Sequence, residues 1–346
     1  NGYKGFYCMK YEINLGQYVD FLNCLIPSGL DANFYTDPAI DFGHDCSRIK
    51  RYSIYFDDSL GQYVTNNPAL PHEYVGWGDC MAYADWAALR PMSELEFEKV
   101  CRGPADSFEP IGLNYDYAYG VHEPVNEEYE LALLSGNSTG EFDSVTNYDP
   151  QTANLVYRGS WFKYDFCEDE EGTELIGFMR NGVFANMATM RGDSLTRINT
   201  GGTYYGVMEM SGNLNERCVG ISERWRSSSI DADTLTEDYD WPLNNTPSCG
   251  STGISFEVLN MKGIKYYYKD CPSVFTGVNG DGELGADGKA DVTGWPKEGK
   301  GGAPGSIIRG GRWNQIKERC YTADRLSLTG ATARTHESTI RFVRTF

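Results

Sequence analysis

Two runs decide the fold: Ile307-Ile308-Arg309-Gly310-Gly311-Arg312-Trp313, and Ile340-Arg341-Phe342-Val343-Arg344 near the end of the sequence. Both are rich in β-branched and aromatic residues, which favour strands. The Gly pair in the first run allows a sharp turn, so that Trp313 can pack against neighbouring backbone. We interpret the two runs as scaffold and the chemically mixed residues between them, 314–339, as the functional surface.

The overall charge limits the classes of molecule that the chain can bind. The 346-residue chain has a formal net charge of −19 and a hydrophobic content of 40%, with 39 Gly and 24 Tyr. A nucleic-acid partner would require a basic face, and anionic lipid would repel this charge. No apolar run approaches the ~20 residues that span a bilayer. We therefore predict no nucleic-acid partner and no membrane span.

Local signals predict three helices. Asn14 is a helix cap before residues 15–25, and apolar residues recur at helical spacing over 78–89. The sequence Ser93-Glu94-Leu95-Glu96 is a capping box, which opens a helix ending at Val100 or Cys101. Strands are predicted at 5–13, 52–56 and 63–64, in addition to the two runs above.

The long irregular stretches predict one domain with insertions. No linker or internal repeat divides residues 1–346, and insertions are expected at about 105–200 and 221–304. Such long loops tend to be functional. The ten Cys form no C-x-x-C motif, which argues against zinc-ribbon and thioredoxin-like sites and leaves disulfide pairing open. The chain begins at Asn1, which fits either a processed mature chain or a trimmed one.

Four segments in sequence order resemble the formylglycine-generating enzyme (sulfatase-modifying factor) family. The resemblance lies in Met9-Lys10-Tyr11-Glu12 with 16–23, in Ala82–Trp86 with Leu89–Glu98, in Gly206-Val207-Met208-Glu209-Met210-Ser211-Gly212-Asn213, and in Arg309-Gly310-Gly311-Arg312-Trp313 with Arg341–Arg344. It implies an α+β domain of C-type-lectin-like fold, with two helices against a small twisted sheet. Family members include copper-dependent oxidases, iron-dependent sulfoxide synthases and non-catalytic binding proteins.

The residues do not match the catalytic members. The oxidases hold Cu(I) between two thiolates five residues apart after the Gly-Gly motif; here the two positions are Gln315 and Cys320. The four His are far apart in sequence, so an iron site has no local signature. We expect no copper and name no catalytic residue, and we keep a formylglycine-generating-type oxidase as an alternative.

A structural calcium site is expected near Gly212. Carboxylates at Glu209 and Glu216 bracket a Gly turn that can direct carbonyl oxygens inward, as calcium prefers. The family resemblance implies Glu209, Gly212, Leu214 and Glu216 as ligands. The alternative is that both Glu face water at the ends of regular elements. A second cation-binding candidate is the loop 279–283 with Asp287 and Asp291, although it lacks EF-hand spacing.

The C-terminal segment resembles the variable region of retroelement-diversified ligand-binding proteins. It concentrates basic residues within an acidic chain, and it mixes them with apolar residues as protein interfaces do. We predict non-catalytic binding of a protein or glycan ligand, outside the cell, at a cell surface or on a virion. The alternative is a structural subunit of a surface layer or filament that contacts copies of itself. The expected ligand-binding residues are Trp313, Asn314, Gln315, Lys317, Glu318, Arg319, Leu326, Leu328, Thr335, His336 and Glu337.

Overall fold

A computed structural model of the chain combines helices with several small sheets, which confirms the predicted α+β class. It describes residues 5–34, 54–104, 117–120, 131–132, 144–145, 148–151, 155–157, 178–220, 222–225, 255–259, 265–270, 275, 277–295, 306–313, 315–322, 324, 334 and 338–346.

The first sheet joins the two ends of the described chain. Its strand order is β1 (Phe6–Cys8), β13 (Phe342–Thr345) and β4 (Arg90–Pro91), with antiparallel pairing throughout. The predicted strand over 5–13 is therefore confirmed only for its first part. Beyond Cys8, isolated hydrogen bonds continue the contact with the C-terminal run, from Met9 N to Phe342 O and from Ile13 N to Ile340 O, both at 3.1 Å.

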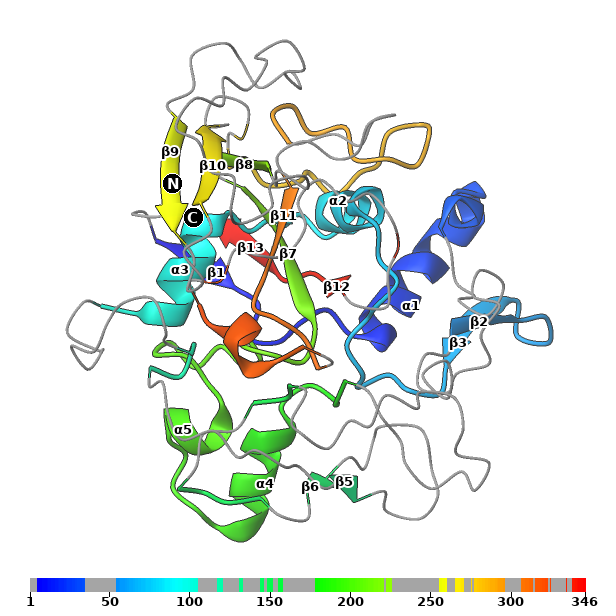
Figure 1. The fold of residues 1–346 in the computed structure, drawn as a ribbon. Coiled ribbons are helices and arrows are strands. Elements are labelled where there is room, and N and C mark those ends of the chain that lie inside the picture. Colours follow the sequence, from blue (N-terminus) through cyan, green and yellow to red (C-terminus); the bar gives the residue numbers. More distant parts are fainter. Residues whose placement is uncertain are drawn as a thin grey trace, which may run out of the picture.

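The second sheet holds the other scaffold run. Its order is β11 (Ser306–Arg309), β7 (Asn215–Val219) and β12 (Ser338–Thr339); β11 pairs antiparallel to β7, and β12 pairs parallel to it. Figure 1 shows these strands at the centre of the molecule, beside β13. The predicted strands of the two runs are thus confirmed, and residues 310–337 leave and re-enter the same sheet.

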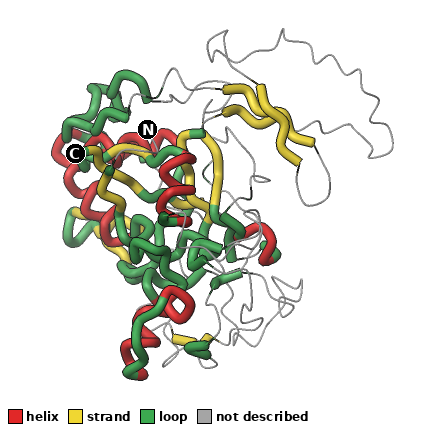
Figure 2. Tube along the Cα trace, turned by 90° about the vertical axis from the view of Figure 1, so that its left-hand side faces the viewer, coloured by secondary structure: helices red, strands yellow, loops and turns green. Residues whose placement is uncertain are grey.

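Three smaller strand groups complete the described sheets. One sheet has the order β8 (Ser222–Trp225), β10 (Lys265–Asp270) and β9 (Ser255–Leu259), and in Figure 2 it stands apart from the other strands. The other two are antiparallel pairs: β2 (Ile54–Asp57) with β3 (Gln62–Thr65), close to the two predicted strand signals, and β5 (Leu131–Ala132) with β6 (Ser144–Val145).

The predicted helices form with the expected caps. Helix α1 spans Leu15–Leu25 and is capped by Asn14; α2 spans Trp77–Trp86; α3 spans Glu94–Arg102 and is capped by Ser93. Two further helices, α4 (Val183–Arg191) and α5 (Arg197–Thr200), form within the stretch 105–200 that we expected to be an irregular insertion. Short 3₁₀ helices are η1 (Ile26–Ser28), η2 (Asp31–Asn33) and η8 (Lys317–Cys320).

Helices α1 and α2 pack on the first sheet through aromatic side chains. Tyr83 of α2 stacks on Phe342 of β13, with ring centroids 5.3 Å apart, and lies 5.4 Å from Phe21 of α1. Trp77 and Phe21 are fully buried. Burial of side chains of this size contributes roughly 1.5–3 kcal/mol each, so this cluster is a main source of stability.

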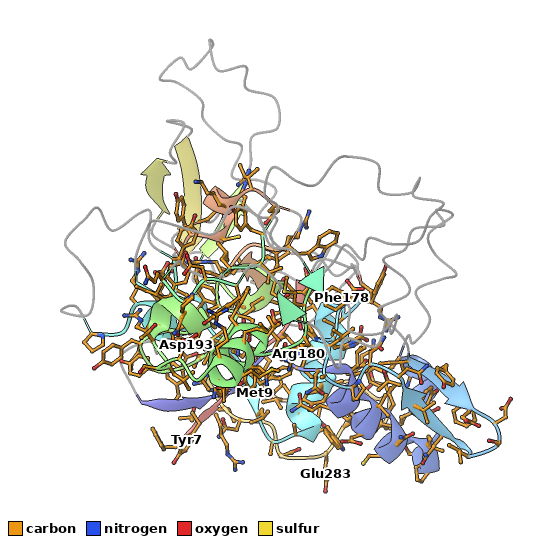
Figure 3. The ribbon with its side chains drawn as sticks, turned by 90° about the horizontal axis from the view of Figure 1, so that it is seen from below. Tyr7, Met9, Phe178, Arg180, Asp193 and Glu283 are labelled. Atoms are coloured by element: carbon orange, nitrogen blue, oxygen red, sulfur yellow. The ribbon has the colours of Figure 1, made fainter. Side chains whose placement is uncertain are left out.

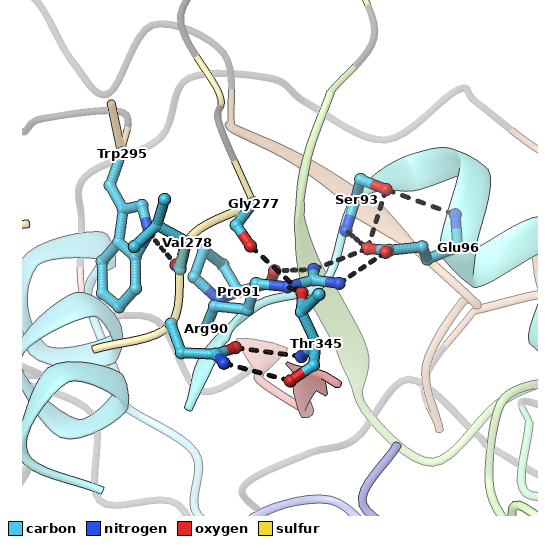
Figure 4. A network of polar contacts seen from close by, with 9 residues as sticks. Arg90, Pro91, Ser93, Glu96, Gly277, Val278, Trp295 and Thr345 are labelled. Atoms are coloured by element: carbon cyan, nitrogen blue, oxygen red, sulfur yellow. Dashed lines mark hydrogen bonds and ion pairs between the residues drawn. The ribbon is translucent and has the colours of Figure 1, made fainter. Parts of the chain in front are cut away.

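A buried ion pair joins β4, α3 and β13 (Figure 4). Arg90 donates to both carboxylate oxygens of Glu96, at 2.9 and 2.7 Å, and its Nε donates to Thr345 Oγ1 at 2.7 Å. Glu96 also accepts the backbone N–H of Ser93 at 2.9 Å. Burial alone would raise the pKa of Glu96, but the bonds from Arg90 outweigh it and hold this pKa below its usual value.

The exposed residues include both aromatic and charged side chains. Seen from below in Figure 3, Tyr7 of β1 and Glu283 of the loop 277–295 point away from the molecule. Among the helices that the structure describes, none is long and apolar enough to cross a membrane.

Candidate functional site: the C-terminal segment and a buried carboxylate cluster

A buried arginine fixes the beginning of the C-terminal segment. Arg309, at the end of β11, forms ion pairs with Glu94 and Glu98 on α3 and also donates to the carbonyl oxygen of Thr322. Burial lowers the pKa of a guanidinium, but the two carboxylates outweigh burial and raise the pKa of Arg309. This network holds residue 322 close to the point at which the segment leaves the sheet.

A second arginine fixes the later part of the segment. Arg334 donates to both oxygens of Asp79, from Nε at 2.6 Å and from Nη2 at 2.7 Å. Asp79 lies in the first turn of α2 and also accepts the backbone N–H of Gly76 at 2.8 Å. The segment is therefore tied to α3 at one place and to the beginning of α2 at another.

Between these ties, residues 311–320 form a tight loop. At Gly311, with φ of +72°, an added Cβ would lie 2.6 Å from the carbonyl oxygen of Arg319 and 2.7 Å from Cys320 Sγ. Arg319 N donates to Ile316 O at 3.0 Å. Ile316 is 53% exposed at the tip of the loop. Gln315, Lys317 and Arg319 are half-buried around it.

Trp313 corrects one expectation of the sequence analysis. We predicted that it contacts a ligand, but it is only 2% exposed and belongs to the main hydrophobic core. Its backbone N–H donates to Asn213 O at 2.9 Å, and its side chain lies in the core. Of the other predicted ligand-binding residues, those outside the described residues are Asn314, the side chain of Glu318, Leu326, Leu328, Thr335, His336 and Glu337.

Cys320 lies in the interior. It is fully buried in a small cluster with Tyr117, Tyr119, Leu155 and Tyr157. Gln315, at the other position that the oxidase resemblance requires, has no sulfur. Within the described ranges, no three side chains of His, Cys, Asp or Glu are grouped so as to hold a metal ion.

The predicted calcium ligands border a buried cluster of three carboxylates around Arg341. Arg341 donates to Glu216 Oε1 from Nε at 2.8 Å, and Nη2 lies 2.7 Å from the same oxygen. It also donates to the carbonyl oxygens of Met208 and Met9, at 2.7 and 3.2 Å. Glu216 is completely buried, so the alternative prediction that it faces water is wrong.

Glu209 and Glu12 complete the cluster. Glu209 is 8% exposed, and its Oε1 accepts the backbone N–H of Gly182 at 2.8 Å; it does not face water either. Glu12 is fully buried, and its Oε2 accepts from Asn213 Nδ2 at 3.0 Å. Among the described residues, no hydrogen-bond donor reaches Oε1 of Glu12, Oε2 of Glu209 or Oε2 of Glu216.

The pKa values of these three carboxyl groups are shifted in their buried surroundings. Burial raises the pKa of Glu209 to about 7, although Arg341 opposes the shift. The pKa values of Glu12 and Glu216 are raised for the same reason, burial, again against the effect of Arg341. Three carboxyl groups share one guanidinium, so each of them takes up a proton more readily than an exposed carboxyl group does.

The remaining two predicted calcium ligands lie in the turn between Glu209 and Glu216. Gly212 has φ of +81°, and an added Cβ would lie 2.3 Å from Val156 O. Leu214 is fully buried. Glu12 was not among the predicted ligands, although it ends the run 9–12 within the first of the four family-like segments. Arg341 was predicted only as part of a scaffold strand and not as a site residue.

The second cation-binding candidate is a loop organised by a buried acid. Asp85 of α2 accepts the backbone N–H groups of Asp281 and Asp291, at 3.2 and 3.1 Å, through its two oxygens. Burial raises the pKa of Asp85, and its backbone hydrogen bonds oppose the shift. Both side-chain oxygens of Asp85 thus accept hydrogen bonds from the backbone of the loop.

One comparison with known proteins assigns a family. The family model described as the sulfatase-modifying factor enzyme 1-like domain matches residues 2–346. A search of the curated proteins found no match. Because the matched range spans almost the whole sequence, the chain belongs to the family of sulfatase-modifying factor enzyme 1-like domains.

Proposed function

We propose that this chain is a non-catalytic member of its family, with a C-type-lectin-like fold, that binds a protein or glycan ligand through its C-terminal segment. The observation that carries the proposal is the way this segment is held. Buried or partly buried ion pairs tie it to α3 and α2, and Ile316 is exposed between the ties. A rigid frame that presents a loop at its surface is a common design for binding sites.

The composition of the loop supports this proposal. An exposed apolar residue, Ile316, is followed by the cationic residues Lys317 and Arg319 in a chain of net charge −19. Apolar centres with charged rims are typical of protein interfaces. Gln315 in place of a thiolate supports binding over copper-dependent oxidation, since the two-sulfur ligand set is incomplete in the sequence. We also propose an extracytoplasmic location, at a cell surface or on a virion.

The test compares one substitution in the loop with one elsewhere. Labelled protein is applied to an array of glycans and of purified surface proteins, and the variant Ile316→Asp is applied beside it. The control is Leu60→Asp, because Leu60 is also an exposed aliphatic residue (60%), on the turn between β2 and β3. We expect a ligand whose binding is lost in Ile316→Asp and retained in Leu60→Asp. Equal binding by both variants would contradict the proposal.

We further propose that calcium stabilises the fold at the predicted site. The support is that Glu209 and Glu216 are buried and each keeps one oxygen without a donor among the described residues, as hard cations require. Glu209, Glu216 and the carbonyl groups of Gly212 and Leu214 would hold the ion, which would supply charge compensation only. We expect calcium to raise the melting temperature of chelator-treated protein, and Glu209→Gln to abolish the rise. An equal rise in that variant would contradict the assignment.

A further inference from the structure

The turn at residues 203–206 exposes two neighbouring tyrosines. Tyr204 is 50% exposed and Tyr205 is 53% exposed. The turn is closed by Gly206 N, which donates to Thr203 O at 3.0 Å, and by Thr203 N, which donates to Val207 O at 2.8 Å. The Thr203 hydroxyl also accepts from Val207 N at 3.1 Å. Three hydrogen bonds therefore fix the backbone that carries the two rings.

The choice of tyrosine is not explained by the turn itself. Central turn positions favour Gly, Pro, Asn, Asp and Ser, whose backbone preferences or short side chains suit the geometry. Exposed aromatic area forgoes the free energy of burial, about 25 cal/mol per Å². The two rings are arranged edge to face, with centroids 5.1 Å apart. Two exposed rings in mutual contact at such a place indicate a contact surface.

An arginine lies over one ring of this aromatic pair. The guanidinium of Arg197, in α5, lies 6.0 Å from the centre of the Tyr204 ring, and its Nη2 donates to Ala118 O at 3.0 Å. It also lies against Gly120, where an added Cβ would be 2.8 Å from Nη1. The guanidinium is thus held between residues 118–120 and the ring of Tyr204, at a distance that permits a cation–π contact.

This turn and the C-terminal segment border the same cluster. Ile198, next to Arg197, packs on the cluster that contains Cys320, and so does Tyr321. The ring of Tyr321 lies 4.8 Å from that of Tyr117. The tyrosine pair is therefore connected to the loop that presents Ile316 through Arg197, its neighbour Ile198 and this cluster.

We propose that Tyr204, Tyr205 and Arg197 form a carbohydrate subsite beside the C-terminal loop, an inference that rests on the proposed binding function. A tyrosine ring offers an apolar face to the C–H groups of a pyranose, and its hydroxyl bonds to sugar hydroxyls. Guanidinium N–H groups donate to the same kind of acceptor. The net charge of −19 repels polyanions, so the ligand is a neutral oligosaccharide.

The experiment uses neutral oligosaccharides as probes. Cellohexaose, chitohexaose, maltohexaose and xylohexaose are titrated into the full chain, with binding followed by calorimetry. The variants are Tyr204→Ala with Tyr205→Ala, and Tyr204→Phe with Tyr205→Phe, because Phe keeps the ring and removes only the hydroxyl. The control is Tyr7→Ala, since Tyr7 is 63% exposed on strand β1, outside the turn 203–206. Circular dichroism checks that each variant is folded.

The expected result is that at least one probe binds and that the Ala pair weakens it about tenfold or more. The Phe pair should weaken it less, and Tyr7→Ala should have no effect. The subsite is overturned if no probe binds, or if the Ala pair binds as tightly as the parent chain. It is also overturned if the Ala pair reduces binding of a protein ligand while every saccharide fails.

The variant Ile316→Asp separates this inference from the proposed function. If Ile316→Asp abolishes binding of an array ligand and the Ala pair leaves all saccharide binding unchanged, the proposed function stands and the subsite fails. If the Ala pair abolishes saccharide binding and Ile316→Asp alters no binding, the subsite stands and the assignment of the C-terminal loop fails.

Discussion

Arg341 and Glu216 form a completely buried ion pair in which one carboxylate oxygen lies 2.8 Å from Nε and 2.7 Å from Nη2 of the guanidinium. The pair joins residue 341, directly before β13, to β7, and so it connects the two main sheets. Glu12 and Glu209 lie in the same interior region, where Arg341 opposes the rise in pKa that burial causes in both carboxyl groups. Arg341 is therefore the cation on which three buried acids depend.

Replacement of Arg341 alone should be severely destabilising. In Arg341→Met the buried carboxylates lose their shared cation, and breaking such a pair costs about 3–5 kcal/mol. The double variant Arg341→Met, Glu216→Leu should recover a large part of this loss, because it removes a charge together with its partner. Urea denaturation of the parent and both variants measures the difference. A double variant no more stable than Arg341→Met would show that Glu216 is not the group left uncompensated.

Two glycines with similar φ angles should differ in how much their replacement by Ala destabilises the fold. Gly212 and Gly192 have φ of +81° and +76°, but a Cβ at Gly212 would lie 2.3 Å from Val156 O, whereas at Gly192 it would meet no atom within 4 Å. Gly192→Ala should cost about 1 kcal/mol, the ordinary strain of a left-handed residue. Gly212→Ala should cost clearly more, as measured by the shift in melting temperature. Equal shifts would contradict the close approach of Val156.

His72 should make the fold sensitive to acid. Burial, with a smaller effect of Arg334, lowers the pKa of His72 from 6.5 to about 3. Between these values the unfolded chain binds a proton that the folded chain does not, so stability falls as the pH falls from 6.5 toward 3. The slope for this one group is about 1.4 kcal/mol per pH unit.

The variant His72→Gln isolates this contribution. Its free energy of unfolding, compared with that of the parent chain at each pH, should become relatively more favourable as the pH decreases below 6.5. Titration of the His72 ring by NMR gives an independent measurement. A His72 pKa near 6.5 in the folded chain would contradict its burial in a neutral form.

Asn279 should stabilise the end of β13. Its Nδ2 donates to Thr345 O at 3.1 Å, and its Oδ1 accepts from Thr345 N at 2.9 Å, so one side chain takes the place of a neighbouring strand. Asn279→Ala should cost about 1–3 kcal/mol, because two backbone groups lose their partners. Glu283→Ala, at an exposed position of the same loop, should change stability by less than about 0.5 kcal/mol. Thermal unfolding of the two variants makes the comparison.

The elements with local signals could be predicted from the sequence. Asn14 and Ser93 each begin a helix where expected, because a cap bonds to backbone only three residues away. Helix α4 has no such signal: Gly182 precedes it without a side-chain cap, and only three of its residues are buried. Its existence depends on contacts that sequence patterns do not show.

The candidate site could be predicted only in part. Glu209 and Glu216 are singled out by their spacing around a Gly turn, but Arg341 is 125 residues from Glu216, and Asn213 is 201 residues from its partner Glu12. No local pattern reports pairs so far apart. Trp313 is equally ambiguous, since an indole after a Gly pair can face a ligand or the core, and only the tertiary packing, which buries it, decides.

The strand order of the first sheet has a consequence for biosynthesis. The central strand β13, residues 342–345, pairs with β1 on one side and β4 on the other, so neither neighbour can complete its hydrogen bonding until the ribosome has added residue 345. After residues 6–91 have been made, some 250 further residues must be synthesised before β13 can cover the aromatic side chains that pack on it. A nascent chain of this kind depends on protection from aggregation during translation.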